Sequence, residues 1–101
     1  MQISYKDKYI KDKIKLISKN HLLENRINQT EELFQKDIAN PKLRLHKIVC
    51  KKDKNRYSIT VINTQYRILA TICEDRAVFL MLVNHKVYDR IKKFNGFYKI
   101  S

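Results

Sequence analysis

The first forty residues carry apolar side chains at helical spacing. Between residues 7 and 20 these side chains stand three or four positions apart, with lysines on the opposite face, which is typical of an amphipathic helix. A second apolar stripe runs from residue 23 to residue 38. Asn40-Pro41 ends it, because proline disfavours helical geometry in the residue before it. The pattern predicts a helical hairpin with one side packed on a sheet.

Beyond Pro41 the spacing changes from helical to alternating. Residues 56–62 and 65–73 each alternate apolar and polar side chains, as half-buried strands do. Residues 77–83 are apolar on both faces, which is typical of a central strand. Polar turns separate the three segments and predict an antiparallel meander.

The ends of the chain add two smaller elements. Residues 2–5 are a candidate short strand, and residues 86–94 have apolar side chains at helical spacing. The predicted fold class is therefore α+β: a helical hairpin packed on a three- to four-stranded antiparallel sheet, with a short C-terminal helix. At this length the chain is expected to be a single domain, residues 1–101.

The predicted register decides which side chains share a face of the sheet. A loop of two or four residues in the first hairpin places Thr60 across from Arg67. Ser58, Thr60, Arg67 and Thr71 then lie opposite the core, and form either an open site or an ordinary solvated face. Strict alternation along the last strand directs His85 toward the core, so the strand end has to turn for His85 to approach Arg67.

The charge balance indicates a polyanionic partner. Lys and Arg total 22 against 10 Asp and Glu, a formal net charge of +12. Such a surplus destabilises a small domain by self-repulsion unless a nucleic acid or an acidic protein neutralises it. The alternative is a lysine-rich surface that serves solubility.

The surplus is densest between residues 42 and 56. Seven cations and one acid, Asp53, occupy these fifteen residues and alternate with apolar side chains. The segment is a candidate phosphate-binding stripe, with a solvated loop as the alternative. Its cations, together called the basic stripe, are Lys42, Arg44, Lys47, Lys51, Lys52, Lys54 and Arg56.

Several classes of protein are disfavoured. No stretch approaches the roughly 20 apolar residues of a membrane span, and the start of the chain lacks the apolar run of a secretory signal. Cys50 and Cys73 lie inside apolar runs, in no metal-binding spacing and too few for a disulfide framework. A cytoplasmic protein without a membrane partner is expected.

The order of these segments resembles the RelE/ParE superfamily of type II toxin–antitoxin systems, most closely the RelE and YoeB kind. The resemblance covers about half of the chain, from Pro41 to Tyr88. Four stretches carry it: Leu45-His46-Lys47-Ile48, Gln65-Tyr66-Arg67-Ile68-Leu69, Glu74-Asp75 and Val83-Asn84-His85-Lys86-Val87-Tyr88.

This resemblance implies a toxin that cuts messenger RNA, often at the ribosome, without metal or cofactor, and so arrests translation. It also implies an acidic antitoxin encoded nearby. Arg67 would hold the phosphate and His85 would transfer a proton. Tyr88 would stack on a base or assist proton transfer, and Lys86 would support the phosphate charge.

The chain also departs from the family pattern. The two lysines on the first hairpin strand of RelE are replaced by Ser58 and Thr60, and Lys42 stands where the YoeB type has a glutamate base. A non-catalytic inhibitor of DNA gyrase, as in ParE, and an RNA-binding module without cleavage are therefore the alternatives. The candidates for the missing general base are His46, Lys47, Lys51 and Lys52.

Overall fold

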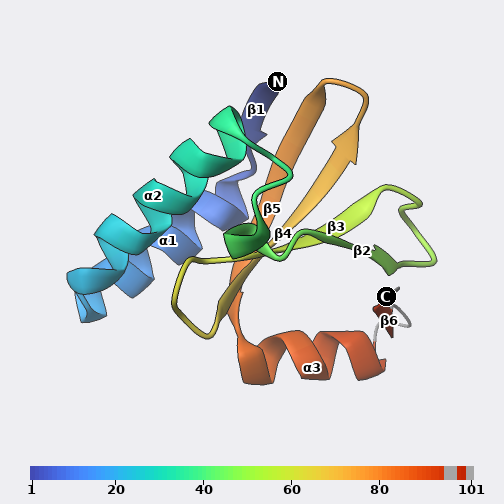
Figure 1. Ribbon diagram of the computed structural model, residues 1–101. Helices are drawn as coiled ribbons and strands as arrows, with labels where there is room; N and C mark the ends of the chain where they lie inside the picture. The colour runs from blue at the N-terminus through green and yellow to red at the C-terminus, as the bar shows by residue number, and fades with distance from the viewer. Residues whose placement is uncertain (95–97, 100–101) are drawn as a thin grey trace.

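The computed structural model of the chain describes residues 1–94 and 98–99 (Figure 1). In chain order its elements are β1 (Gln2–Tyr5), α1 (Asp7–Lys19), α2 (Leu22–Lys36), the 3-10 helix η1 (Pro41–Leu43), β2 (His46–Val49), β3 (Arg56–Thr60), β4 (Tyr66–Cys73), β5 (Arg76–Asn84), α3 (His85–Phe94) and β6 (Tyr98–Lys99).

The strands form one sheet in the order β1-β5-β4-β3-β2-β6. Its pairs are antiparallel except for β1, which runs parallel to β5. The predicted α+β class, helical hairpin, meander and C-terminal helix are confirmed. The sheet has more strands than predicted and is mixed, because the chain crosses over from β1 through both helices before it returns to the sheet. None of the described helices is long and apolar enough to cross a lipid bilayer.

The helical hairpin of α1 and α2 covers one face of the sheet (Figure 1). The stripe predicted for α2 is buried as expected, since its positions recur at the helical period. The buried side chains of α2 are Leu23, Ile27, Thr30 and Phe34.

The stripe predicted for α1 is buried only in part. Its expected members were Tyr9, Ile10, Ile14, Leu16 and Ile17. Tyr9, Leu16 and Ile17 pack in the core, whereas Ile10 and Ile14 are 44% and 64% exposed. The ring of Tyr9 lies edge-on to that of Phe79 at a centroid separation of 5.4 Å. Its hydroxyl donates to Glu31 Oε2 at 2.6 Å. The aromatic contact therefore anchors the buried face of the helix.

Strand β5 contains a β-bulge. Ala70 on β4 pairs with Phe79, but the neighbouring Leu69 pairs with Met81, so Leu80 has no counterpart. An extra residue of this kind reverses the alternation of side chains beyond it.

The bulge determines where the end of β5 points. Phe79 faces the helical hairpin. Val83 faces the opposite side, where it pairs with Arg67. His85 follows Val83 by two residues, so it emerges on the face that carries Arg67. The expectation from strict alternation, which directed His85 toward the core, is wrong because it assumed an unbroken pleat.

Helix α3 covers part of this second face. Asn84 caps it, accepting a hydrogen bond from Val87 N at 2.7 Å, as N-cap side chains do. Ser58 and Thr60, predicted on an open polar face, are buried here, whereas Arg67 and Thr71 are partly exposed. The small core beneath α3 consists of Ile48, Leu69, Val83 and Tyr88.

A buried hydroxyl ties α2 to the turn between β3 and β4. Thr30 is 0% exposed. Its Oγ1 donates to the carbonyl of Arg26 at 2.7 Å and accepts from Ile62 N at 2.9 Å. The next residue, Asn63, has a φ of 55° and turns the chain. The tether therefore holds the turn against the helix.

Replacing Thr30 tests the tether. Thr30→Val keeps the shape of the side chain and leaves Ile62 N buried without an acceptor. The free energy of unfolding should fall by about 1–3 kcal/mol, as measured by urea denaturation. Thr30→Ser keeps the hydroxyl and loses one methyl group, a loss of about 0.8 kcal/mol. A valine variant more stable than the serine variant would contradict this role.

Candidate functional site

A pocket of about 210 Å³ opens where β5 ends and α3 begins. It contains all three residues expected to be catalytic, Arg67, His85 and Tyr88. Arg44 of the basic stripe reaches it from the segment before β2. The complete lining is Arg44, His46, Thr60, Arg67, His85, Tyr88 and Asp89.

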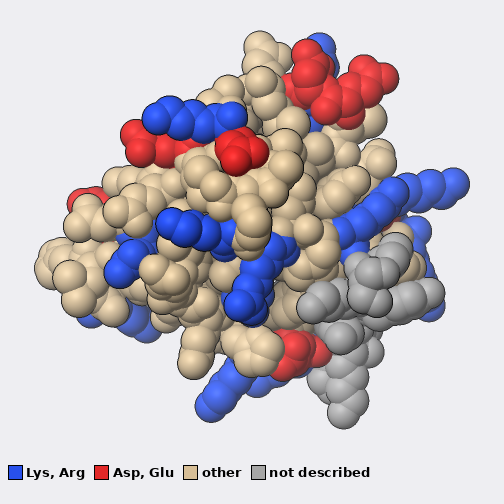
Figure 2. All heavy atoms as spheres, in the orientation of Figure 1, with Lys and Arg blue, Asp and Glu red and all other residues tan. Residues whose placement is uncertain are grey.

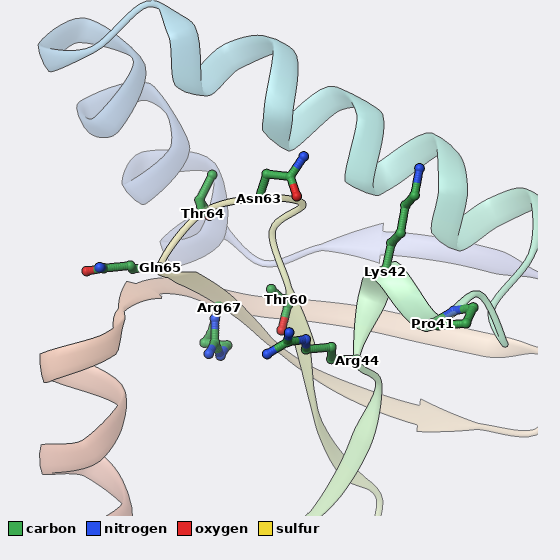
Figure 3. A pocket seen from close by; sticks show the side chains of 8 residues that line it. All are labelled: Pro41, Lys42, Arg44, Thr60, Asn63, Thr64, Gln65 and Arg67. Carbon is green, nitrogen blue, oxygen red and sulfur yellow. The ribbon is translucent and has the colours of Figure 1, made fainter.

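A second pocket of about 540 Å³ shares Arg44, Thr60 and Arg67 with the first. Figure 3 shows the guanidinium of Arg44 extending toward Arg67, with Thr60 beside them. Within the described residues neither arginine forms an ion pair with a carboxylate. Two neighbouring guanidiniums repel each other unless an anion lies between them. Their planar donors match the oxygens of a phosphate.

The backbone at Arg44 is strained. Its φ of 44° and ψ of 42° lie in the left-handed region, which costs a residue with a Cβ roughly 1–2 kcal/mol. The strain is held by the preceding turn, where Leu43 is fully buried and Asn40 accepts a hydrogen bond from Lys42 N at 3.0 Å. This conformation leads the chain from η1 into β2 and directs Arg44 into the pocket.

His46 has a defined tautomer. Its Nδ1 lies 2.8 Å from the carbonyl oxygen of Arg44. A carbonyl only accepts hydrogen bonds, so Nδ1 carries the proton, and the neutral ring keeps its lone pair on Nε2. Nε2 lies 3.4 Å from the Tyr88 hydroxyl. An imidazole held in this way is suited to accept a proton in the pocket. The other candidate bases line neither pocket: Lys47, Lys51 and Lys52.

Tyr88 lines the pocket but is largely buried. The side chain is 5% exposed, so a role in stacking on a base does not fit its burial. Burial raises the pKa of the Tyr88 phenol, and the charge of Asp89 adds to this, against the opposing effects of Ser58 and Arg67. The phenol is therefore a hydrogen-bond donor at neutral pH.

His85 pairs with Asp89, an acid that the sequence motifs did not identify as a site residue. Its Nε2 lies 3.3 Å from Asp89 Oδ2, one helical turn along α3, and both side chains are about half exposed. The spacing of four residues could have identified Asp89 only if the helix had been predicted to begin at His85 and not at Lys86. Lys86, predicted to support the phosphate, is exposed and lines neither pocket.

The basic stripe divides into three parts. Lys42 and Arg44 line the pockets, whereas Arg56 is largely buried and paired with Asp53 at 3.1 Å. Figure 2 shows Lys and Arg side chains gathered across the middle of the face between the helical hairpin and α3. The other four cations of the stripe are exposed: Lys47, Lys51, Lys52 and Lys54.

Asp53 organises the loop between β2 and β3. Its carboxylate accepts hydrogen bonds from the Thr71 hydroxyl, from Asn55 N at 2.9 Å and from Arg56 Nε at 3.1 Å. Burial acts to raise the pKa of Asp53, but these donors outweigh it and hold the pKa below its usual range. A single acid thus fixes a loop that presents several lysines. Among the described residues no group of three or more His, Cys, Asp or Glu side chains is arranged to hold a metal ion.

The fold is that of known bacterial and archaeal toxins. YafQ from E. coli strain BL21(DE3) superposes with a TM-score of 0.68 at 16% identity, over 86% of this chain and 96% of YafQ. A chain of the E. coli DinJ-YafQ toxin-antitoxin complex superposes with a TM-score of 0.67 at 18% identity, over 85% of this chain and 93% of the other. A chain of the RelB-RelE antitoxin-toxin complex from Methanococcus jannaschii superposes with a TM-score of 0.57 at 24% identity, over 86% of this chain and 96% of the other. No family model and no curated protein matches the sequence. The RelE-like fold expected from the sequence is therefore confirmed.

Two variants of Arg44 separate its charge from its strain. Arg44→Gly and Arg44→Ala both remove the guanidinium, but only glycine takes left-handed geometry without a clash at Cβ. The glycine variant should exceed the alanine variant in free energy of unfolding by about 1 kcal/mol. Urea denaturation of the two proteins measures this, and equal stabilities would show that the backbone is not strained.

Stability should depend on pH through Asp53. A carboxylate with a depressed pKa stabilises the folded state above its unfolded pKa, near 3.8. That contribution is lost as the pH falls through the lower folded value. Asp53→Asn should therefore be less stable than the parent at pH 7, and the gap should narrow in acid. Asp75→Asn, in the exposed turn after β4, is the control, and a gap that widens in acid would reverse the assignment.

Proposed function

We propose that the protein is the toxin of a type II toxin–antitoxin system, a metal-independent endoribonuclease that cleaves messenger RNA at the ribosome and arrests translation. One observation carries the proposal. Two guanidiniums, Arg44 and Arg67, and two imidazoles, His46 and His85, line the same pocket. The shared fold with YafQ and with the RelE of the RelB-RelE complex supports it.

The pocket holds the groups that RNA cleavage requires. The arginines bind the phosphate and stabilise the charge that develops on it. His46 takes the proton of the ribose 2′-hydroxyl through Nε2, and this oxygen attacks phosphorus. As the bond between O2′ and phosphorus forms, the bond to the 5′-oxygen breaks and His85 donates a proton to that oxygen. A 2′,3′-cyclic phosphate and a 5′-hydroxyl result.

Two residues support these groups. Asp89 accepts a hydrogen bond from His85 and orients its ring. In the absence of RNA the Tyr88 hydroxyl, kept protonated by burial, lies 3.4 Å from His46 Nε2 and orients that ring, and the 2′-hydroxyl takes its place at this nitrogen when RNA binds. Tyr88 thus acts through its hydroxyl.

The proposed partners are those that the charge favours. The exposed cations of the basic stripe, together with Lys86, contact messenger RNA and the ribosome in the cytoplasm through phosphates. In the absence of RNA, an acidic antitoxin encoded nearby covers this basic face. The formal net charge of +12 attracts either polyanionic partner and speeds its association with the protein. The antitoxin-toxin pairing of RelB with RelE supports such a partner.

Transcript mapping after induction of the protein tests the proposal. New 5′-hydroxyl ends should appear in messenger RNA. Replacing His46 or His85 by alanine should lower cleavage about 10²- to 10⁴-fold, and Arg67→Ala about 10²- to 10³-fold. Lys19→Ala, on the exposed face of α1, is the matched control and should leave cleavage unchanged.

Three outcomes would contradict all or part of the proposal. Intact transcripts in translationally arrested cells would exclude a nuclease, and loss of DNA supercoiling by gyrase would then favour the ParE-like alternative. Full toxicity of the His85→Ala protein would remove His85 from the mechanism. Purified protein that binds message and ribosomes without cutting would make it an RNA-binding module.

A further inference from the structure

A third pocket lies beyond the turn between β3 and β4. Together with the two pockets already described it forms a continuous groove. It has a volume of about 370 Å³ and shares Lys42 and Asn63 with the 540 Å³ pocket. Figure 3 shows both of these side chains pointing from the second pocket toward α2. Arg26 and Lys36, both exposed on α2, line the far side of the third pocket. Three hollows thus follow one another from the cleavage pocket to α2.

Cations recur along this whole groove. Its two acids are Asp89 at the cleavage end and Glu32 at the α2 end. In the part of the chain that the structure describes, none of the groove cations forms an ion pair with a carboxylate. A row of unneutralised cations suits an extended polyanion with charges at regular intervals. In order along the groove, these cations are Arg67, Arg44, Lys42, Lys36 and Arg26.

The groove offers no platform for bases. No aromatic side chain of the described residues lines the second or third pocket, and the ring of Tyr88 in the first is buried. Proteins that bind bases in single strands do so largely by stacking on exposed aromatic rings. The cations of the groove instead favour contacts to phosphates, which carry no sequence information.

We propose that the pocket beside α2 is a distal phosphate subsite for the RNA strand that is being cut. The strand leaves Arg44 and Arg67, passes Lys42 at the β3–β4 turn, and is held by Arg26 and Lys36 through its backbone, without base preference. The inference rests on the proposed function for the identity of the strand. An acidic polypeptide would match the charges, but continuity with the pocket of His46 and His85 favours RNA.

Binding of uncleavable RNA tests the subsite. The probes are 2′-O-methyl oligonucleotides, which lack the attacking hydroxyl. A trinucleotide is lengthened one residue at a time at its 5′ or its 3′ end, and fluorescence anisotropy measures its affinity for the full chain. Extension at one end only should strengthen binding, because the third pocket lies on one side of the cleavage pocket. The gain should be the same for different base sequences.

Variants assign that gain to α2. The double substitution Arg26→Ala with Lys36→Ala should abolish the gain, roughly 10-fold, and lower the slope of log affinity against log salt by about 0.7 per lost phosphate contact. The trinucleotide should bind the variant as it binds the parent. Glu32→Gln removes the acid from the pocket and should strengthen binding of long probes alone. Lys15→Ala with Lys19→Ala, on α1 and outside all three pockets, is the matched control.

The outcomes separate this inference from the proposed function. A trinucleotide that requires Arg67 but gains nothing on extension would overturn the subsite and leave the cleavage proposal standing. An extension gain that requires Arg26 and Lys36, in a protein that cuts no transcript, would support the subsite and overturn cleavage. A gain unaffected by the α2 variants, together with weaker binding of a poly-glutamate peptide to them, would assign the pocket to an acidic polypeptide.

Discussion

Strand β5 buries side chains against two separate layers, and the unpaired Leu80 decides which residues face which layer. Before the bulge, Phe79 packs into the aromatic contacts with the helical hairpin. Beyond it, Val83 packs beneath α3. His85 then leaves the strand on the same side as Arg67, at the mouth of the pocket. With regular pairing the same residues would bury His85 against the hairpin. The site therefore depends on one irregularity in backbone pairing.

Much of this arrangement could be predicted because it follows from periodicity. The buried stripe of α2 and the pairing of Thr60 with Arg67 both agree with the sequence pattern. The bulge could not be predicted, because residues 77–83 are apolar on both faces and no glycine or proline marks Leu80. The exposure of Ile10 and Ile14 on α1 could not be predicted either, because both fit the helical stripe as well as the buried Tyr9 does.

The candidate site was predicted in part for a related reason. Arg67 and His85 stand on strands with strong patterns, so their neighbourhood could be inferred. His46 stood among several possible bases, because its tautomer depends on the carbonyl of Arg44, and sequence does not reveal that contact. Asp89 matters only once α3 is known to begin at His85. The pattern of residue types along a sequence does not predict a side chain's role when that role depends on a contact with the backbone of another residue.

The parallel pairing of β1 with β5 bears on the order in which the chain assembles. Gln2 pairs with Arg76 and Tyr5 with Phe79, so β1 has no partner until the chain has been synthesised as far as β5. At about 5–20 residues per second, the ribosome needs roughly 4–15 s to supply that partner. Closing so long a loop is entropically slow. His85 follows β5 directly, so a nascent chain has no assembled site before that strand has been synthesised and paired.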